Sequence, residues 1–168
     1  MKEIPLVKQC FLDQRPWYNN CSARLMRSST EILYRRLIDA WNARDAAAFA
    51  ICFSGETTCV GFDGSEMHSP SDIKNQLTEI FSNHPTARYV TIVREIKTIS
   101  SDVQLLRAHV GMIQPGEKKV DESKNAVQVM VAVNDKIMLF QNTPCRYDGR
   151  DEARHKLTEE LQRSADSY

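Results

Sequence analysis

The stretch from Asn125 to Pro144 restricts the fold more than any other part of the chain. It reads NAVQVMVAVNDKIMLFQNTP, with valine at alternate positions before Asn134-Asp135 and an apolar run after it. Alternation and β-branched content favour strands over a helix. Because Asn and Asp tolerate the positive φ of a two-residue hairpin turn, we predict two antiparallel strands joined at Asn134-Asp135. Apolar side chains on both faces predict a central hairpin covered on both sides.

Three helices are predicted ahead of this hairpin. The first covers 28–43 and begins with a capping box at Ser28, and the second covers 46–52 behind Asp45 as its N-cap. The third starts at Ser69, where a capping serine precedes a proline at the first helical position. Each start signal is followed by apolar residues at helical spacing, so each helix should face a core.

Further strands complete the pattern. Short strands are predicted over 57–62 and 66–68, long strands over 88–99 and 103–113, and a last helix from Gly149 through Arg163. Helices grouped ahead of consecutive antiparallel strands indicate an α+β fold. We expect a cone-shaped, curved antiparallel sheet wrapped over about three N-terminal helices, plus a C-terminal helix. The open end of such a cone could hold a small molecule.

The length of 168 residues suits one domain. We predict an N-terminal extension over 1–29, a single cone-fold domain over 30–163 and a short tail over 164–168. The extension has no clear period, so it either lies across the domain or a neighbouring subunit or forms a partly disordered arm.

Charge and cysteine content narrow the class of protein. Lys and Arg together number 22, as do Asp and Glu, which argues against nucleic acid or an anionic membrane surface as a main partner. We find no apolar run near the ~20 residues of a membrane span and no secretory signal. The cysteines are odd in number, scattered and without a CxxC pair, which predicts a reduced, cytoplasmic location: Cys10, Cys21, Cys52, Cys59 and Cys145.

Six segments carry a resemblance to a known family: 33–53 (LYRRLIDAWNARDAAAFAICF), 60–65 (VGFDGS), 89–96 (YVTIVREI), 105–112 (LLRAHVGM), 125–133 (NAVQVMVAV) and 139–144 (LFQNTP). The chain resembles the SgcJ/EcaC family, labelled oxidoreductases, within the cystatin-like, nuclear transport factor 2-like superfamily. That superfamily also includes ketosteroid isomerases and SnoaL-type cyclases. The resemblance implies a cone-shaped α+β barrel, usually dimeric through the outer face of the sheet. It does not settle a reaction, because similar cones serve catalysis, ligand carriage and assembly.

Two amides on the hairpin are candidate ligand contacts, Gln128 and Asn142. Pairing outward from the turn sets Val127 opposite Asn142 and Gln128 opposite Gln141. The two amides would then point to opposite faces of the sheet, one into the cavity and one onto the dimer face, unless a bulge shifts the register. The alternative is that the sheet itself satisfies both amides.

Three titratable residues are candidates for catalysis. His109 lies within a predicted strand and His68 near the expected cavity rim, and histidine suits acid–base work near neutral pH. Asp63 could abstract a proton beside a carbonyl if an apolar site raised its pKa. The alternatives are a packed or interface histidine at 109 and a turn residue at Asp63-Gly64.

Apolar residues should line the pocket together with the two amides: Trp41, Phe53, Phe62, Met112 and Met130. No metal is expected, because the four histidines are far apart in sequence with no HxH or HxxxH spacing. No cofactor is expected either, since the chain has no nucleotide-binding glycine pattern, nucleophile elbow or paired-cysteine motif.

Two functions stay open at this point. The first is a homodimeric cone-fold protein that binds a small, partly hydrophobic molecule, with metal-free proton transfer as the chemistry it could perform. The second is a non-catalytic ligand-binding or assembly module. An open cavity with a titratable group inside favours the first. A pocket filled by Met112, Met130 and Phe140, with no histidine exposed to it, favours the second. Redox chemistry ranks third because it would need a borrowed cofactor.

Overall fold

The computed structural model describes residues 28–167, so the predicted extension lies almost wholly outside the described residues. Four α-helices span α1 Ser29–Asn42, α2 Ala46–Ala50, α3 Pro70–Asn83 and α4 Asp151–Asp166, and a short 3-10 helix spans Glu122–Lys124. Six strands span β1 Phe53–Val60, β2 Glu66–Met67, β3 Arg88–Thr98, β4 Val103–Ile113, β5 Ala126–Val133 and β6 Lys136–Pro144.

Side-chain caps set the starts of the first three helices, as the sequence predicts. Ser28 Oγ accepts from the Glu31 backbone N–H (3.1 Å) at α1, and Asp45 Oδ1 accepts from the Ala48 N–H (2.8 Å) at α2. At α3, Ser69 Oγ accepts from the Asp72 N–H (3.1 Å). Each bond satisfies a backbone donor that a helix leaves free in its first turn.

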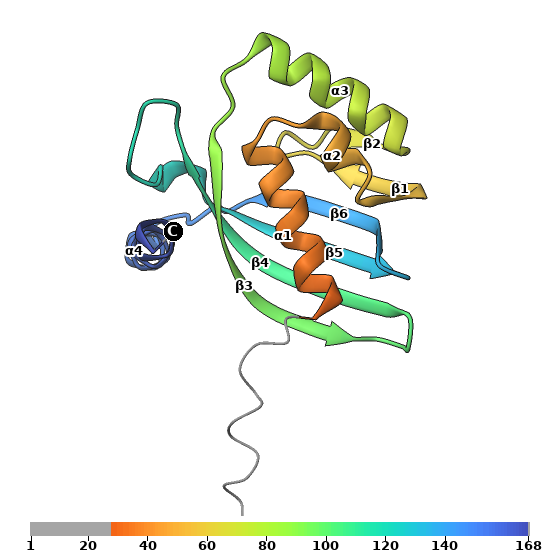
Figure 1. Ribbon diagram of the computed structural model, residues 1–168. Helices are drawn as coiled ribbons and strands as arrows, with labels where there is room; N and C mark the ends of the chain where they lie inside the picture. The colour runs from red at the N-terminus through yellow and green to blue at the C-terminus, as the bar shows by residue number, and fades with distance from the viewer. Residues whose placement is uncertain (1–27, 168) are drawn as a thin grey trace, which may run out of the picture.

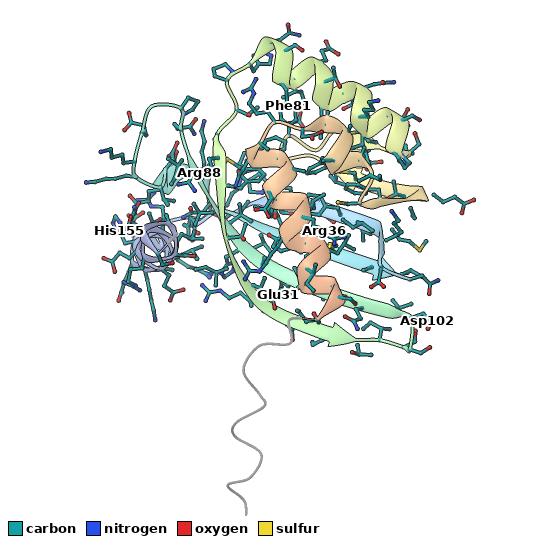
Figure 2. All side chains as sticks on the ribbon, viewed as in Figure 1. Glu31, Arg36, Phe81, Arg88, Asp102 and His155 are labelled. Carbon is teal, nitrogen blue, oxygen red and sulfur yellow. The ribbon has the colours of Figure 1, made fainter. Side chains whose placement is uncertain are left out.

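The strands form one curved, six-stranded sheet in the order β2-β1-β6-β5-β4-β3. The predicted α+β cone is confirmed. Figure 1 shows α1 crossing the inner face of the sheet, with α2 and α3 over the end that carries β1 and β2 and α4 beyond β3. Figure 2 shows Phe81 on the side of α3 that faces α1 and α2, whereas His155 on α4 lies far from that layer.

The main core lies between the helices and the inner face of the sheet. Its fully buried side chains include Tyr34 and Leu37 of α1, Leu106 of β4, Met130 of β5 and Ile137 of β6. A second, smaller cluster lies on the outer face, where α4 packs on the ends of β3 and β4: Val90, Ile113, Val120, Leu157 and Leu161. The sheet is therefore covered on both sides only at that end.

The central hairpin is confirmed, with positive φ at Asn134 (49°) and Asp135 (59°). Its predicted register is wrong. Val131 pairs with Leu139 but Ala132 with Ile137, so one strand carries an extra residue, Met138, at a β-bulge. Beyond the bulge every pairing moves by one residue, and Gln128 lies opposite Asn142 rather than Gln141. Both amides therefore point into the core, where both are buried.

Two further predictions about the sheet are corrected. The sheet is not wholly antiparallel, since β1 runs parallel to β6. Phe53 pairs with Ile137 and Cys59 with Phe140, so this pairing joins two segments that are far apart in the sequence. The hairpin is not covered on both faces either. The inward residues of β5 are buried, but its outward valines are only half-buried.

Several element boundaries also differ from the prediction. β1 begins at Phe53, before the predicted start at Thr57, and α2 ends at Ala50 rather than 52. The last helix runs to Asp166, so residues 164–166 of the predicted tail are helical. The domain limits of 30 and 163 otherwise stay a prediction.

Gly111 tests the packing of α4 on the outer face. A Cβ added there would meet Val120 Cγ1 at 2.7 Å and Leu161 Cδ1 at 3.1 Å. Gly111→Ala should therefore lower the free energy of unfolding by about 1–3 kcal/mol through overpacking, measured by urea denaturation. Gly55→Ala is the matched control, since nothing lies within 4 Å of its added Cβ. Equal stability of the two variants would contradict this packing.

Candidate functional site

A cavity of about 220 Å³ opens between the helices and the β1–β6 end of the sheet. Apolar side chains make most of its wall: Ile38 and Trp41 of α1, Leu77 and Ile80 of α3, and Phe140 of β6. The loop over 61–65 and Gln76 of α3 are half-buried or exposed, so they form its mouth. Tyr89, Phe140 and Asn142 are buried and form its base.

Aromatic contacts hold one side of the cavity rigid. The Trp41 ring stacks on Tyr89, with centroids 4.6 Å apart and planes 2° apart, and meets Phe81 edge-on at 5.4 Å. Trp41 Nε1 donates to the Ala87 carbonyl oxygen (2.9 Å), so its polar atom is satisfied away from the cavity. Such aromatic pairs stabilise the fold beyond the contribution of the apolar area that they bury, and they fix the position of the Tyr89 ring.

Four polar side chains lie at the base of the cavity or directly behind that base. Asn142 Nδ2 donates to Tyr89 Oη (3.2 Å), and Tyr34 Oη donates to Gln128 Oε1 (2.6 Å). Within residues 28–167, the other amide atoms, Asn142 Oδ1 and Gln128 Nε2, have no hydrogen-bond partner although both are buried. Of the two amides only Asn142 lines the cavity. The register shift at the β-bulge brings Gln128 and Asn142 to the same face of the sheet.

The titratable groups of the cavity are not set for proton transfer near neutral pH. Burial raises the pKa of Tyr89, and it raises the pKa of the Cys59 thiol to about 12. The Ser65 hydroxyl and backbone N–H, which both donate to the exposed Asp63 carboxylate, hold the pKa of Asp63 below its ordinary value. Among the described lining residues Asp63 is the only charged one. A base that abstracts a carbon-bound proton needs the opposite shift.

The structure brings together some predicted site residues and not others. Trp41, Phe62, Asp63 and Asn142 line the cavity. The remaining predicted pocket residues are buried in the core around it rather than lining it: Phe53, Met112, Gln128 and Met130.

Neither histidine candidate reaches the cavity. The His68 side chain is 65% exposed and pairs with Glu66 (3.6 Å). His109 lies on the outer face of the sheet, where Arg94 Nε donates to its Nδ1 (2.9 Å) and Arg94 also pairs with Glu160 of α4. An outward strand position places His109 on the far side of the sheet from any ligand in the cavity.

Sequence reasoning missed Tyr89, the hydroxyl at the base of the cavity. It opens the segment YVTIVREI, but nothing in that alternating pattern distinguishes it from the apolar residues around it. Its partners come from α1 and β6, more than forty residues away on either side. Within 28–167 no group of three or more His, Cys, Asp or Glu is arranged to hold a metal ion, and no helix is long and apolar enough to cross a membrane.

Comparisons with solved structures show the fold. A domain of unknown function from Nostoc punctiforme, described as cystatin-like, is 21% identical with a TM-score of 0.69, covering 80% of this chain and 93% of that one. The chain has a cystatin-like fold. A protein of unknown function from Shewanella oneidensis, described as nuclear transport factor 2-like, is 14% identical with a TM-score of 0.52. The match covers 68% of this chain and 96% of that one. A ketosteroid isomerase-like protein from Erwinia carotovora atroseptica is 11% identical with a TM-score of 0.55. That match covers 69% of this chain and 93% of the other.

At these identities the similarity shows the fold and not an activity. No protein-family model matches the sequence, and no curated protein matches it. What distinguishes this cystatin-like chain must therefore come from its own cavity and surfaces.

The setting of His109 predicts a pH dependence of stability. Burial, followed by the neighbouring guanidinium groups of Arg94 and Arg107, lowers the pKa of His109 below its ordinary value of 6.5, against a smaller opposing effect of Glu160. As pH falls, the unfolded chain therefore takes up this proton before the folded chain does. The free energy of unfolding should decrease from about pH 7.5 to about pH 5.5.

His109→Gln should remove that share of the pH dependence, because glutamine does not titrate. The measurement is urea denaturation of both proteins across that pH range. Identical slopes for the wild type and the variant would show that His109 is not held neutral on the outer face.

Proposed function

We propose that this protein binds a small, partly hydrophobic molecule in the cavity between α1, α3 and the β1–β6 end of the sheet. The observation that carries the proposal is the cavity itself: an apolar wall, a mouth at the loop over 61–65, and a buried polar base at Tyr89 and Asn142. Concave apolar pockets with a few convergent polar groups are the usual form of small-molecule sites.

Ligand binding without catalysis is better supported than proton transfer. An isomerase-like reaction needs a base near the ligand, and among the described lining residues the only carboxylate, Asp63, has a lowered pKa and lies exposed at the mouth. His68 and His109 lie elsewhere. Membership of the SgcJ/EcaC family rests on the six segments quoted above. Oxidoreductase activity has less support, because the sequence has no nucleotide-binding glycine pattern.

A cytoplasmic location is part of the same proposal. Among the described residues Cys52, Cys59 and Cys145 are free thiols, as expected in a reducing compartment.

Filling the cavity tests the proposal. Ile80→Trp adds an indole to the wall and should abolish binding of ethylbenzene, measured by ligand-observed NMR, because the larger side chain takes the space of the ligand. Ile51→Trp is the matched control: Ile51 is 69% exposed and lies outside the cavity, so binding should persist. Equal binding to all three proteins, or a wild type that binds neither ethylbenzene nor a polar aromatic compound of the same size, would refute the proposed function.

A second candidate function, assembly into a homodimer, is supported by the outer face of the sheet. There the outward residues of β4, β5 and β6 form a half-buried apolar surface, which we call the valine face: Val103, Leu105, Val127, Val129, Val131, Val133 and Leu139. Arg107 of β4 interrupts this face opposite Val129, and it pairs with Glu95 (3.6 Å), which also pairs with Lys97 (3.1 Å). A chain of formal net charge zero does not repel a second copy of itself.

A charge placed in the valine face should break such a dimer. We expect the wild type to have the mass of a dimer by light scattering coupled to size exclusion, and Val131→Glu that of a monomer. The cross-strand neighbours of Val131 are Leu105 and Leu139, so the new carboxylate would be buried unpaired. Ile51→Glu, at an exposed position away from this face, should stay dimeric. A monomeric wild type would exclude this second function and leave ligand binding untouched.

A further inference from the structure

We propose that the cavity selects a small apolar alcohol, whose hydroxyl accepts a hydrogen bond from Tyr89 Oη and donates one to Asn142 Oδ1. The inference rests on the proposed function and adds to it the chemical class of the ligand. It depends on two neighbouring groups at the base of the cavity: the Tyr89 hydroxyl, which accepts from Asn142 Nδ2, and Asn142 Oδ1, which is buried without a hydrogen-bond partner within residues 28–167.

Asn142 supplies the acceptor. The residue is 5% exposed and lines the cavity, and its Nδ2 donates to Tyr89 Oη (3.2 Å). No donor within residues 28–167 reaches its Oδ1. A buried amide oxygen without a partner is uncommon in proteins and costs free energy until a donor arrives. A ligand hydroxyl in the cavity would provide that donor.

Tyr89 supplies the donor. Because its oxygen already accepts from Asn142 Nδ2, its own proton is available for another acceptor. Stacking on Trp41 holds the ring in place, and Tyr89 is 7% exposed on the cavity wall. Burial raises the pKa of Tyr89, so the hydroxyl stays protonated at every physiological pH. Donor and acceptor thus lie side by side, joined by the Asn142–Tyr89 hydrogen bond.

The charge of the site excludes ionised head groups. Among the described lining residues there is no Lys, Arg or His to pair with a carboxylate or phosphate, and a buried anion without a partner is strongly disfavoured. Asp63, the one charge, lies at the exposed mouth and is already bonded to Ser65. An ether or ketone could accept from Tyr89 but could not donate to Asn142. A hydroxyl does both.

The cavity also limits the apolar part of the ligand. A dry cavity of about 150 Å³ holds benzene, so the space here suits a compound of about nine non-hydrogen atoms. The walls of Leu77, Ile80 and Phe140 would enclose that part, with the hydroxyl directed to the base. Benzyl alcohol is a probe of this size and polarity.

The experiment compares dissociation constants, measured by calorimetry or NMR titration, for benzyl alcohol, benzyl methyl ether, ethylbenzene and benzoate. The wild type should bind benzyl alcohol about tenfold more tightly than the ether, which lacks the donated hydrogen bond, and should bind benzoate least. Asn142→Leu and Tyr89→Phe should each weaken the binding of benzyl alcohol about tenfold, whereas ethylbenzene should bind each variant as tightly as the wild type or more tightly.

Asn75→Leu is the matched control, because it makes the same exchange of amide for leucine at an exposed position of α3 that does not line the cavity. It should leave the ratio of alcohol to ethylbenzene affinity unchanged. Tyr89→Phe removes one oxygen atom and keeps the ring, so it provides the test if Asn142→Leu proves unfolded by circular dichroism.

The outcomes separate the two proposals. If ethylbenzene binds but the two variants change alcohol and ethylbenzene affinity equally, or if benzoate binds best, the inference about the hydroxyl is overturned and ligand binding stands. If the wild type binds none of the four probes, the proposed function fails and this inference fails with it.

Discussion

The packing of α1 across the inner face of the sheet is the contact on which the rest of the structure depends. Tyr34 and Leu37 are fully buried there against the central strands, and the Tyr34–Gln128 hydrogen bond (2.6 Å) satisfies the phenol inside that interface. Because α1 covers the sheet and α3 stands over β1, space remains between the two helices and the end of the sheet. The cavity is thus a result of where the helices lie on a curved surface.

The β-bulge at Met138 gives this cavity its polar base. Without it, alternation would send Gln128 and Asn142 to opposite faces, and the cavity would end in apolar side chains and the Tyr89 hydroxyl. With it, two neutral amides and two phenols gather at one place under the sheet. Buried polar groups left partly unsatisfied are costly, so a ligand that completes them gains affinity and selectivity together. The site is therefore suited to reading a neutral head group.

The two faces of the sheet have different roles. The inner face holds the cavity, whereas the outer face carries α4 at one end and the half-buried valine face over the rest. His109 lies on the outer face among Arg94, Arg107 and Glu160, so its titration acts on the attachment of α4 and not on a ligand. Ligand binding and assembly can thus be examined by separate substitutions in this cystatin-like fold.

The sequence by itself determined the features that depend on neighbouring residues. The caps at Ser28, Asp45 and Ser69, the turn at Asn134-Asp135 and the α+β class all follow from interactions spanning a few residues. The resemblance in six segments pointed to the same fold, and four of the residues proposed from the sequence for the site line the cavity: Trp41, Phe62, Asp63 and Asn142. Only the tertiary structure decided the parallel pairing of β1 with β6, the bulge, the part played by Tyr89 and the face on which His109 lies. These depend on contacts between distant segments, and in a sheet one extra residue reverses the direction of every side chain beyond it.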